Sequence, residues 1–463
     1  MTESNCISYP TIKLWEETGA SLLIAIKSYM DLCLNLGTQS LREGILAEDL
    51  TARIDYTLGA IHLPMSRQLA ASSAALAQSR NNLASPFHRL PAEVMFEIFM
   101  AVVYDATDKE IINPPYMEQD VLVIYRRLYN LLGTCSTWKD IIINRGALWL
   151  VIPMTRNPRT HKQGPFRLSL ERSTGNKLHL AVNPWISTTS SDLNEVLTKY
   201  LPRFHSINLE AVNHHEATAT IEKLLQSDTH ESLSKLSIGV YMGYSIIDSI
   251  PRESDHIISR NHPQHALFQR LLERLTAIHI SGAIIRWDTL TFSTRLNELR
   301  IERVALGYDD QIIPFLQTLS SASELRDLKI VSVVTFRRSP TTTPNMKRTS
   351  LTWFPRLRSL LIQDVYLNTL EFLLPTISHG SHHLVLFLSD KSLQIKSLED
   401  NDNNDDETEG SEDWSPKLVN LCEILEPVSV DTLMISGHGT WGGMWLTGTM
   451  FRRLLQSMPT IKT

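Results

Sequence analysis

The sequence predicts a protein of mixed class (α+β / α/β), with helices up to about residue 153 and alternating strands and helices beyond residue 165. Three observations support this prediction. Apolar residues recur at helical spacing through residues 11–84, and further amphipathic helices follow in residues 85–153. From residue 165 onward, a short alternating apolar pattern returns about every 20 to 45 residues, which is typical of an irregular solenoid of strand–helix units.

Residues 11–84 predict a helical hairpin region, because their apolar residues are spaced alternately by four and three positions. The first run is followed by a break at 37–40, and Pro64 interrupts the second run. The apolar seam can fold back and pack on the helices that follow, or it can pair with another chain. The seam residues are Leu22, Ile26, Tyr29, Cys33 and Leu36, then Leu46, Leu50, Ile54, Leu58 and Ile61, and finally Leu69, Leu76 and Leu83.

Residues 85–153 contain three short motifs in a fixed order. Pro91 suits the first position of a helix, and Glu93 places a carboxylate at the positive end of the helix dipole. An apolar stripe of Val94, Ile98 and Val102 follows. The motifs are Leu90-Pro91-x-Glu93-Val94-x-x-x-Ile98-Phe99, Leu132-x-x-Cys135-x-x-Trp138-Lys139-x-Ile141 and Leu148-Trp149-x-x-Ile152.

These motifs together resemble an F-box, the helical module that docks substrate receptors onto the Skp-type adaptor of cullin-RING ubiquitin ligases. The helical region that runs into it is similar to the expanded F-box families of mushroom-forming fungi. One departure is an insertion between Phe99 and Leu122, longer than in a compact F-box. The resemblance implies that the adaptor-binding residues are Leu90, Pro91, Glu93, Val94, Ile98, Phe99, Leu132, Cys135, Trp138, Leu148 and Trp149.

Residues 165–463 carry a repeated Leu-x-x-Leu-x-Ile unit, whose last two apolar residues share one face of a strand. Helix-like segments lie between the copies at 221–225, 267–272, 312–319 and 367–374. A further strand is expected at Leu384 to Leu388. The copies begin at Leu233, Leu296, Leu325 and Leu357, and looser copies begin at Phe204, Leu275 and Val430.

This unit resembles a degenerate leucine-rich repeat. Where regular repeats have a buried Asn or Cys, this chain has Tyr241, Val304, Val333 and Val365, so the asparagine ladder is missing. An ordinary α/β sheet with irregular crossovers is the alternative. In a solenoid, the outward-facing strand positions line the binding surface. We therefore expect a target-binding surface at Lys235, Glu298, Arg300 and Lys329, together with Ser237, Asp327, Ser359 and Leu361.

Charge and composition narrow the choice of function. The net charge is −6, which disfavours a general nucleic-acid binder. Residues 399–413 hold nine acidic side chains, so the rest of the chain carries a net charge of +3. A run of like charges cannot form a packed core, so we expect this segment to be a disordered loop. Four scattered cysteines and the absence of an apolar leader favour a reducing compartment and a cytoplasmic or nuclear protein without a membrane segment.

The motifs of common catalytic sites are not found. Gly437-x-Gly439-x-x-Gly442 imitates a dinucleotide fingerprint, but no acidic residue follows it. The histidines do not form a metal-binding motif, so we expect no metal, no cofactor and no enzymatic activity.

The sequence therefore predicts an N-terminal helical hairpin and F-box helices followed by an irregular leucine-rich-repeat-like solenoid. The expected function is a substrate-recruiting subunit of an SCF-type ubiquitin ligase. Its partners would be the Skp-type adaptor, the cullin-RING ligase and an unidentified protein substrate. The alternative function is a non-ligase leucine-rich-repeat scaffold or sensor.

Overall fold

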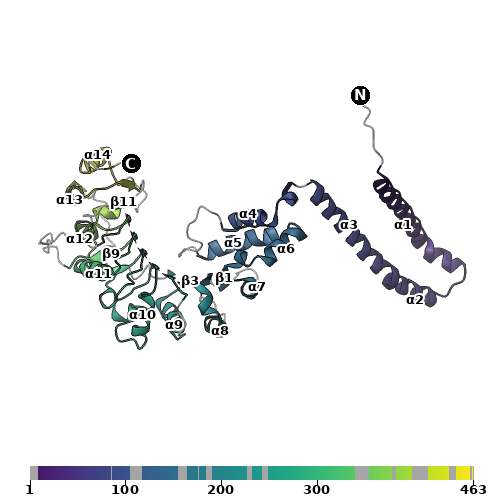
Figure 1. The fold of residues 1–463 in the computed structure, drawn as a ribbon, viewed down its shortest axis with the longest axis horizontal. Helices are drawn as coiled ribbons and strands as arrows, with labels where there is room; N and C mark the ends of the chain where they lie inside the picture. Colours follow the sequence, from purple (N-terminus) through teal and green to yellow (C-terminus); the bar gives the residue numbers. More distant parts are fainter. Residues whose placement is uncertain are drawn as a thin grey trace, which may run out of the picture. The chain divides into compact units, whose positions relative to one another are not determined.

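The computed structural model describes most of the chain as two compact units, Met1–Pro91 and Ala92–Thr463, and its class is mixed α/β with a parallel sheet, as the sequence predicts (Figure 1). The described residues are 9–84, 86–104, 117–154, 164–175, 177–183, 190–226, 232–241, 249–338, 354–377, 382–398, 415–436, 445–458 and 461. The acidic segment 399–413, the proline-containing insertion after Tyr104 and the glycine-rich segment 437–444 lie outside these ranges.

The N-terminal unit is a pair of long helical arms. Helix α1 (Pro10–Arg42) forms the first arm, and α2 (Ala47–Thr57), a π-helical turn (Leu58–His62) and α3 (Leu63–Ala84) form the second. Tyr29 and His62 approach to 3.3 Å between the phenol oxygen and Nε2, which joins the arms.

Two sequence expectations about this unit are wrong. The helix does not break at 37–40; it ends near Gly44, whose φ of +80° suits a residue without a side chain. Pro64 does not interrupt the second arm either. The π-helical turn just before it, where Leu63 N–H bonds to Leu58 O, widens the helix where the proline would otherwise clash.

The apolar residues of this unit are mostly exposed. Leu22, Leu36, Leu69 and Leu76 are all at least 40% exposed, whereas Ser40 is the buried residue among those described in α1 and α2. Helix α1 has the length and apolar composition of a membrane span, a test that signal sequences and core helices also pass.

A three-helix module begins the second unit. It consists of α4 (Ala92–Tyr104), α5 (Met117–Leu132), α6 (Ser136–Asn144) and a 3-10 turn (Gly146–Trp149). Its core contains Met95, Phe99, Leu128, Ile142 and Trp149, and it continues onto the first two strands of the sheet through Val151 and Ala181.

Among the described residues, ten strands form one parallel sheet, in which each strand pairs with the next strand of that sheet along the chain. Two further strands, β7 (Ala305–Tyr308) and β9 (Val334–Phe336), form a separate parallel pair. In spatial order, the ten are β1 (Val151–Met154), β2 (Leu178–Val182), β3 (Phe204–Ala211), β4 (Lys235–Val240), β5 (Ala277–Ser281), β6 (Glu298–Glu302), β8 (Asp327–Val331), β10 (Ser359–Gln363), β11 (His383–Leu388) and β12 (Thr432–Ile435).

Helices α8 to α13 follow one side of this sheet, as Figure 1 shows. The apolar strand residues, such as Leu236 and Ile238 on β4, pack with these helices in one continuous core. The helices of this region are α7 (Gly164–Arg172), α8 (Ser190–Tyr200), α9 (His214–Leu225), α10 (His265–Leu272), α11 (Ile312–Leu319), α12 (Leu367–Ile377), α13 (Ser415–Leu425) and α14 (Gly448–Gln456).

The strands expected from the Leu-x-x-Leu-x-Ile pattern are confirmed: β3, β4, β5, β6, β8, β10 and β12 lie on the seven copies, and β11 lies on the expected eighth strand. The first Leu of each unit precedes its strand and is buried, as at Leu233 and Leu296. The pattern misses β1 and β2; in β2, whose Leu180 is in register with Ile207, Lys177 stands where the leading apolar residue would be.

Successive turns after the strands share one backbone conformation. Gly282, Arg303, Ser332 and Asp364 follow β5, β6, β8 and β10, and all have φ between +49° and +64°. Each donates its N–H to a carbonyl at the end of the next strand; for example, Arg303 N lies 2.9 Å from Val331 O. The turns therefore stack on one another along the sheet.

Candidate interaction surfaces

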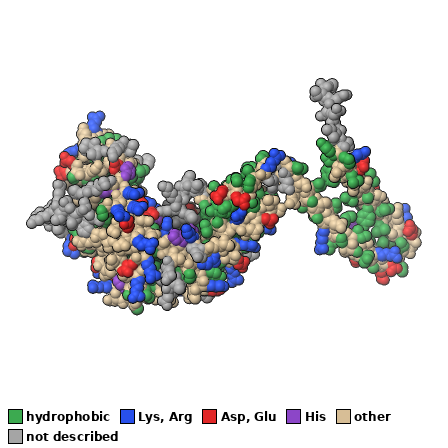
Figure 2. Space-filling view, in the orientation of Figure 1, with side chains coloured by type: hydrophobic (Ala, Val, Ile, Leu, Met, Phe, Trp, Pro, Cys, Tyr) green, Lys and Arg blue, Asp and Glu red, His purple; other side chains and the backbone are tan. Residues whose placement is uncertain are grey.

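Helix α4 presents two apolar residues of its predicted stripe to solvent, while the third, Ile98, also packs against the module core. Val94 and Val102 are 43% and 44% exposed, and Ile98 between them is half-buried. The residues one position further along, Met95, Phe99 and Val103, are buried and hold the helix to the module. Figure 2 shows hydrophobic side chains gathered over this part of the unit. The stripe predicted from the sequence is therefore an exposed face of α4.

Polar contacts fix the first turn of α4. Glu93 accepts a hydrogen bond from Arg145 over 3.3 Å, and the Arg145 guanidinium lies 5.6 Å from the centre of the Phe96 ring. Leu90 and Pro91, which end the N-terminal unit, are exposed. The expected adaptor-binding residues Leu90, Pro91, Glu93 and Val94 thus all have accessible side chains.

Other residues expected to bind an adaptor lie inside the module. Phe99, Leu148 and Trp149 are each 1% exposed, and Trp149 Nε1 donates to the Ile142 carbonyl over 2.9 Å. The Phe99 ring lies 5.0 Å from that of Trp138, which is half-buried. Leu132 and Cys135 are also half-buried. In this structure, the three buried side chains stabilise the module and do not form its surface.

The buried Tyr125 joins the module to the sheet, whereas the half-buried Tyr104 bonds within the module. Tyr125 donates its hydroxyl hydrogen bond to the Val151 carbonyl over 2.7 Å, and Tyr104 donates to the Leu148 carbonyl over 3.0 Å. Burial raises the pKa of both phenols above the ordinary value, so both remain neutral donors. The module is therefore packed against β1 rather than tethered to it.

The strand residues expected to bind a target lie on the sheet face opposite the packed apolar residues. Arg300 on β6 is in register with Lys329 on β8, and Glu298 on β6 and Lys235 on β4 are both in register with Ala277 on the strand between them, β5. The sheet therefore brings all four expected residues onto one surface that crosses β4 to β8.

Charges on this surface are paired with one another. Glu298 lies 3.3 Å from Lys329 Nζ and 3.4 Å from His279 Nε2. Arg300 donates to Glu302 over 3.0 Å, and Arg303 lies 3.5 Å from the same carboxylate. A partner binding here would meet a network of mixed sign rather than a field of one sign.

The same face becomes apolar toward the C-terminal strands. Leu361, Val385, Phe387 and Met434 occupy neighbouring register positions on β10, β11 and β12. Met434 is 49% exposed and the other three are half-buried. The sequence pattern pointed to Leu361 alone. The other three could have been found by counting outward-facing positions along the two looser strands.

Histidines mark the other end of the face. His179 on β2 forms a 2.7 Å hydrogen bond with Ser206 on β3, and its ring lies perpendicular to that of His205. Burial, together with the nearby His205 and Lys235, lowers the pKa of His179 to about 4. The imidazole is therefore neutral at physiological pH.

Within the described ranges, no group of three or more His, Cys, Asp or Glu side chains is placed to hold a metal ion. Cys33, Cys135 and Cys422 are free thiols. The segment that imitates a dinucleotide fingerprint lies outside those ranges, although Trp445 beside it donates its indole N–H to the Ser436 carbonyl over 2.7 Å.

No protein-family model matches this sequence, and no curated protein is detectably similar to it.

Proposed function

We propose that this protein is a substrate-recruiting F-box subunit of an SCF-type cullin-RING ubiquitin ligase. The observation that carries the proposal is the exposed stripe of Val94, Ile98 and Val102 on α4, within a three-helix module that begins with the F-box-like motif. A helix that keeps one apolar face for its own core and exposes a second is suited to binding another protein.

The adaptor-binding surface in this proposal is narrower than the motif. On the second unit it consists of Val94, Ile98 and Val102, while the buried Phe99, Leu148 and Trp149 stabilise the module that presents it; Leu90 and Pro91, exposed at the end of the first unit, directly precede α4 in the sequence and are proposed to bind as well. Apolar anchors at the centre of an interface commonly carry most of the binding free energy. Glu93 and Arg145 would form part of the polar rim.

We further propose that the strand–helix units form an irregular leucine-rich-repeat-like solenoid that binds the target. Three features support this proposal. The strands are parallel and pair in sequence order, helices α8 to α10 and α11 to α13 contact their neighbours along one side, and the turns after β5, β6, β8 and β10 share a conformation. Valines at 304, 333 and 365 are buried where a regular repeat has its asparagine ladder.

The target surface in this proposal is the open face of the sheet. Its charged part at Lys235, Glu298, Arg300 and Lys329 adjoins the apolar part at the C-terminal strands. An apolar area beside paired charges resembles the centre and rim of a protein interface. A protein or peptide is therefore a more suitable target than a phosphate backbone, which would require an excess of positive charge.

A scaffold or sensor without ligase function is the second candidate, and one observation favours it. The core of the three-helix module continues onto Val151 and Ala181 of the sheet, so the module also covers the first strands as a cap. The exposed stripe favours the ligase proposal over the scaffold proposal, because a module that only caps the sheet does not require apolar side chains in contact with solvent.

The test is a binding measurement between the full chain and a purified Skp-type adaptor. Val94→Asp with Val102→Asp should weaken the complex by about 2 kcal/mol or more, roughly 30-fold in Kd, because apolar anchors become charged. Leu90→Ala with Pro91→Ala should weaken it as well. The matched control is Leu267→Asp, an apolar residue of α10 that is 37% exposed.

All variants should keep the circular dichroism spectrum and melting temperature of the wild type. The proposal fails if the wild-type chain does not bind the adaptor, or if the stripe variants bind as tightly as the wild type and the control.

A further inference from the structure

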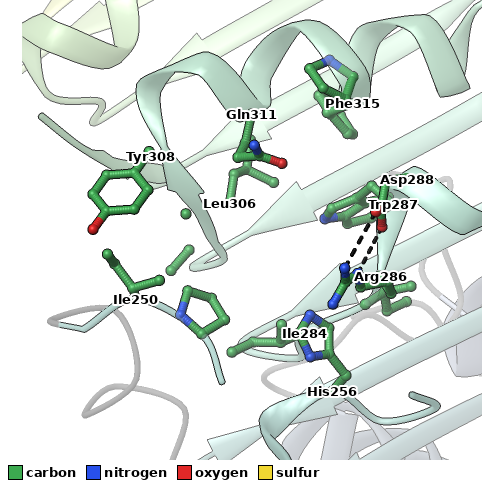
Figure 3. A pocket seen from close by; sticks show the side chains of 15 residues that line it. Ile250, His256, Ile284, Arg286, Trp287, Asp288, Leu306, Tyr308, Gln311 and Phe315 are labelled. Atoms are coloured by element: carbon green, nitrogen blue, oxygen red, sulfur yellow. Dashed lines mark hydrogen bonds and ion pairs between the residues drawn. The ribbon is translucent and has the colours of Figure 1, made fainter. Parts of the chain in front are cut away.

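A pocket of about 210 Å³ lies where β5 and β6 end, beside the small strand β7 (Figure 3). Its lining combines apolar and aromatic side chains, such as Ile284, Tyr308 and Phe315, with polar ones at His256, Arg286, Asp288 and Gln311. The residues come from the segments after the three neighbouring strands β4, β5 and β6, and from α11 with the turn before it.

Trp287 contributes an unused hydrogen-bond donor to this pocket. The residue is 7% exposed, and its ring packs edge-on against Phe315 at 5.1 Å and near Phe292 at 6.1 Å. Its carbonyl accepts a hydrogen bond from Thr318 Oγ1 over 3.0 Å, which holds the backbone in place.

The indole nitrogen Nε1 of Trp287 is buried and has no hydrogen-bond partner within the described part of the chain. Figure 3 shows this nitrogen on the edge of the ring that faces the pocket. A buried donor without an acceptor is costly in a folded protein, so an acceptor supplied by a ligand would remove an existing penalty.

The charged groups of the pocket are already engaged. Arg286 Nε donates to Asp288 over 2.8 Å, and a second nitrogen of Arg286 contacts the Glu253 carboxylate. Figure 3 draws the Arg286–Asp288 contacts as dashed lines. The guanidinium is therefore not available to recruit an anion, and the two carboxylates are not available to recruit a cation. The chemistry of the walls favours an uncharged occupant.

The volume of the pocket further limits which ligands can bind there. A cavity of about 150 Å³ lined by apolar side chains accommodates one benzene ring, whereas pockets for whole small-molecule ligands span about 300–1,000 Å³. A volume of about 210 Å³ therefore suits one ring or one branched side chain, and not a nucleotide or a large cofactor.

We propose that this pocket binds one uncharged aromatic or branched side chain of an extended peptide segment, with a peptide carbonyl of that segment accepting the N–H of Trp287. Assigning the segment to the protein target rests on the proposed function. The pocket itself, with its orphan donor, stands without that assignment.

The probe is N-acetylphenylalaninamide, which carries one aromatic ring and peptide carbonyls. It is titrated into the full chain labelled with ¹⁵N at the tryptophan indoles. We expect a saturable downfield shift of the Trp287 N–H resonance, while the other eight tryptophan indoles serve as internal controls. N-acetyllysinamide and N-acetylaspartamide should bind at least tenfold more weakly, since the charged groups of the wall are already paired.

Two variants test the geometry by calorimetry. Trp287→Phe keeps an aromatic ring but removes the donor together with part of the indole, and it should weaken binding of N-acetylphenylalaninamide by about fivefold to tenfold. Ala305→Phe should fill the pocket and abolish binding. If Ala305→Phe does not fold, Trp287→Phe and the indole resonance still decide the outcome.

The proposal is overturned if the phenylalanine probe causes no saturable shift at Trp287, if the charged probes bind equally well, or if Trp287→Phe binds with unchanged affinity. Adaptor binding of the same preparations separates this result from the proposed function. Loss of pocket binding with adaptor binding intact refutes the pocket alone, and absence of adaptor binding in the wild type refutes the ligase assignment alone.

Discussion

His179 is a residue whose ionisation differs between the folded and the unfolded chain at mildly acidic pH. Its ring is largely enclosed between β2 and β3, where Ser206 bonds to Nδ1 and both His205 and Lys235 oppose a positive charge. The folded pKa of about 4 is below the value of 6.5 for a free histidine. The unfolded chain therefore binds a proton more readily than the folded chain between these two values.

The sign of the pH effect follows from this difference. Above pH 6.5 the imidazole is neutral in both states, and stability is unaffected. As the pH falls from 6.5 toward 4, the unfolded state takes up the proton first, so the folded state loses up to about 3 kcal/mol of relative stability. His179→Gln cannot titrate and should show a flatter profile over this interval. Urea unfolding at several pH values measures the difference, and parallel profiles for the two proteins would contradict the prediction.

Which residues of α4 face the core could not be deduced from the sequence. Val94, Ile98 and Val102 have the same four-residue spacing as Met95, Phe99 and Val103, and both sets are apolar. Periodicity shows that a stripe exists, but the neighbouring helices decide which of two stripes they cover. Here they cover the second stripe, and the first remains on the surface.

At the scale of elements, the repeated strands were the easiest to predict. Leu236 and Ile238 alternate with other residues and follow a buried leading leucine, Leu233. This pattern predicts both where the strand lies in the sequence and which of its side chains point into the core. β7 and β9 carry no such signal, because they are short and pair only with each other. The pocket beside β7 could not be foreseen for the same reason.

A buried polar cluster joins three of these elements. Asn368 at the start of α12 is fully buried, and its Nδ2 donates to Asp309 Oδ1 over 2.7 Å and to the Thr335 carbonyl of β9 over 2.8 Å. Its Oδ1 accepts from the backbone N–H of Lys396 over 3.0 Å. One side chain thus ties α12 to β9, to the turn before α11 and to the segment after β11.

Replacing Asn368 by Leu should destabilise the protein by about 2–3 kcal/mol, since the Asp309 carboxylate and the Lys396 N–H would lose buried partners. The matched control is Asn297→Leu at an exposed position, which should change the free energy of unfolding by less than about 0.5 kcal/mol. Urea unfolding of the two variants checks this difference. Equal effects would show that the cluster does not contribute as its geometry suggests.

At the scale of the whole molecule, the apolar core clusters of the described residues come entirely from the second unit. The sequence predicted the N-terminal arms as helices, because heptad spacing is a local signal. It could not predict what covers their apolar residues, since Leu22 and Leu76 are exposed within their own unit. The second unit has the core that an independently folding domain requires.

Removal of residues 1–84 should therefore leave the second unit folded, with a melting temperature within a few degrees of that of the full chain. Removal of residues 1–104 is the control, because it also takes away Met95, Phe99 and Val103 from the module core. The longer deletion should lower the melting temperature by at least about 10 °C or prevent folding. Calorimetry on both proteins measures this, and equal losses would contradict the prediction.

The order of the strands in the main sheet also has a consequence for synthesis. Each strand from β2 to β12 pairs with the strand of that sheet that leaves the ribosome just before it. Within this sheet, the two strands of each pair are near each other in the sequence and are synthesised one after the other, so each pairing closes only a short loop of chain. The three-helix module emerges before any strand of this sheet and can present the edge of β1 as a template. Nascent chains can then lengthen the sheet in the direction of translation, one strand at a time.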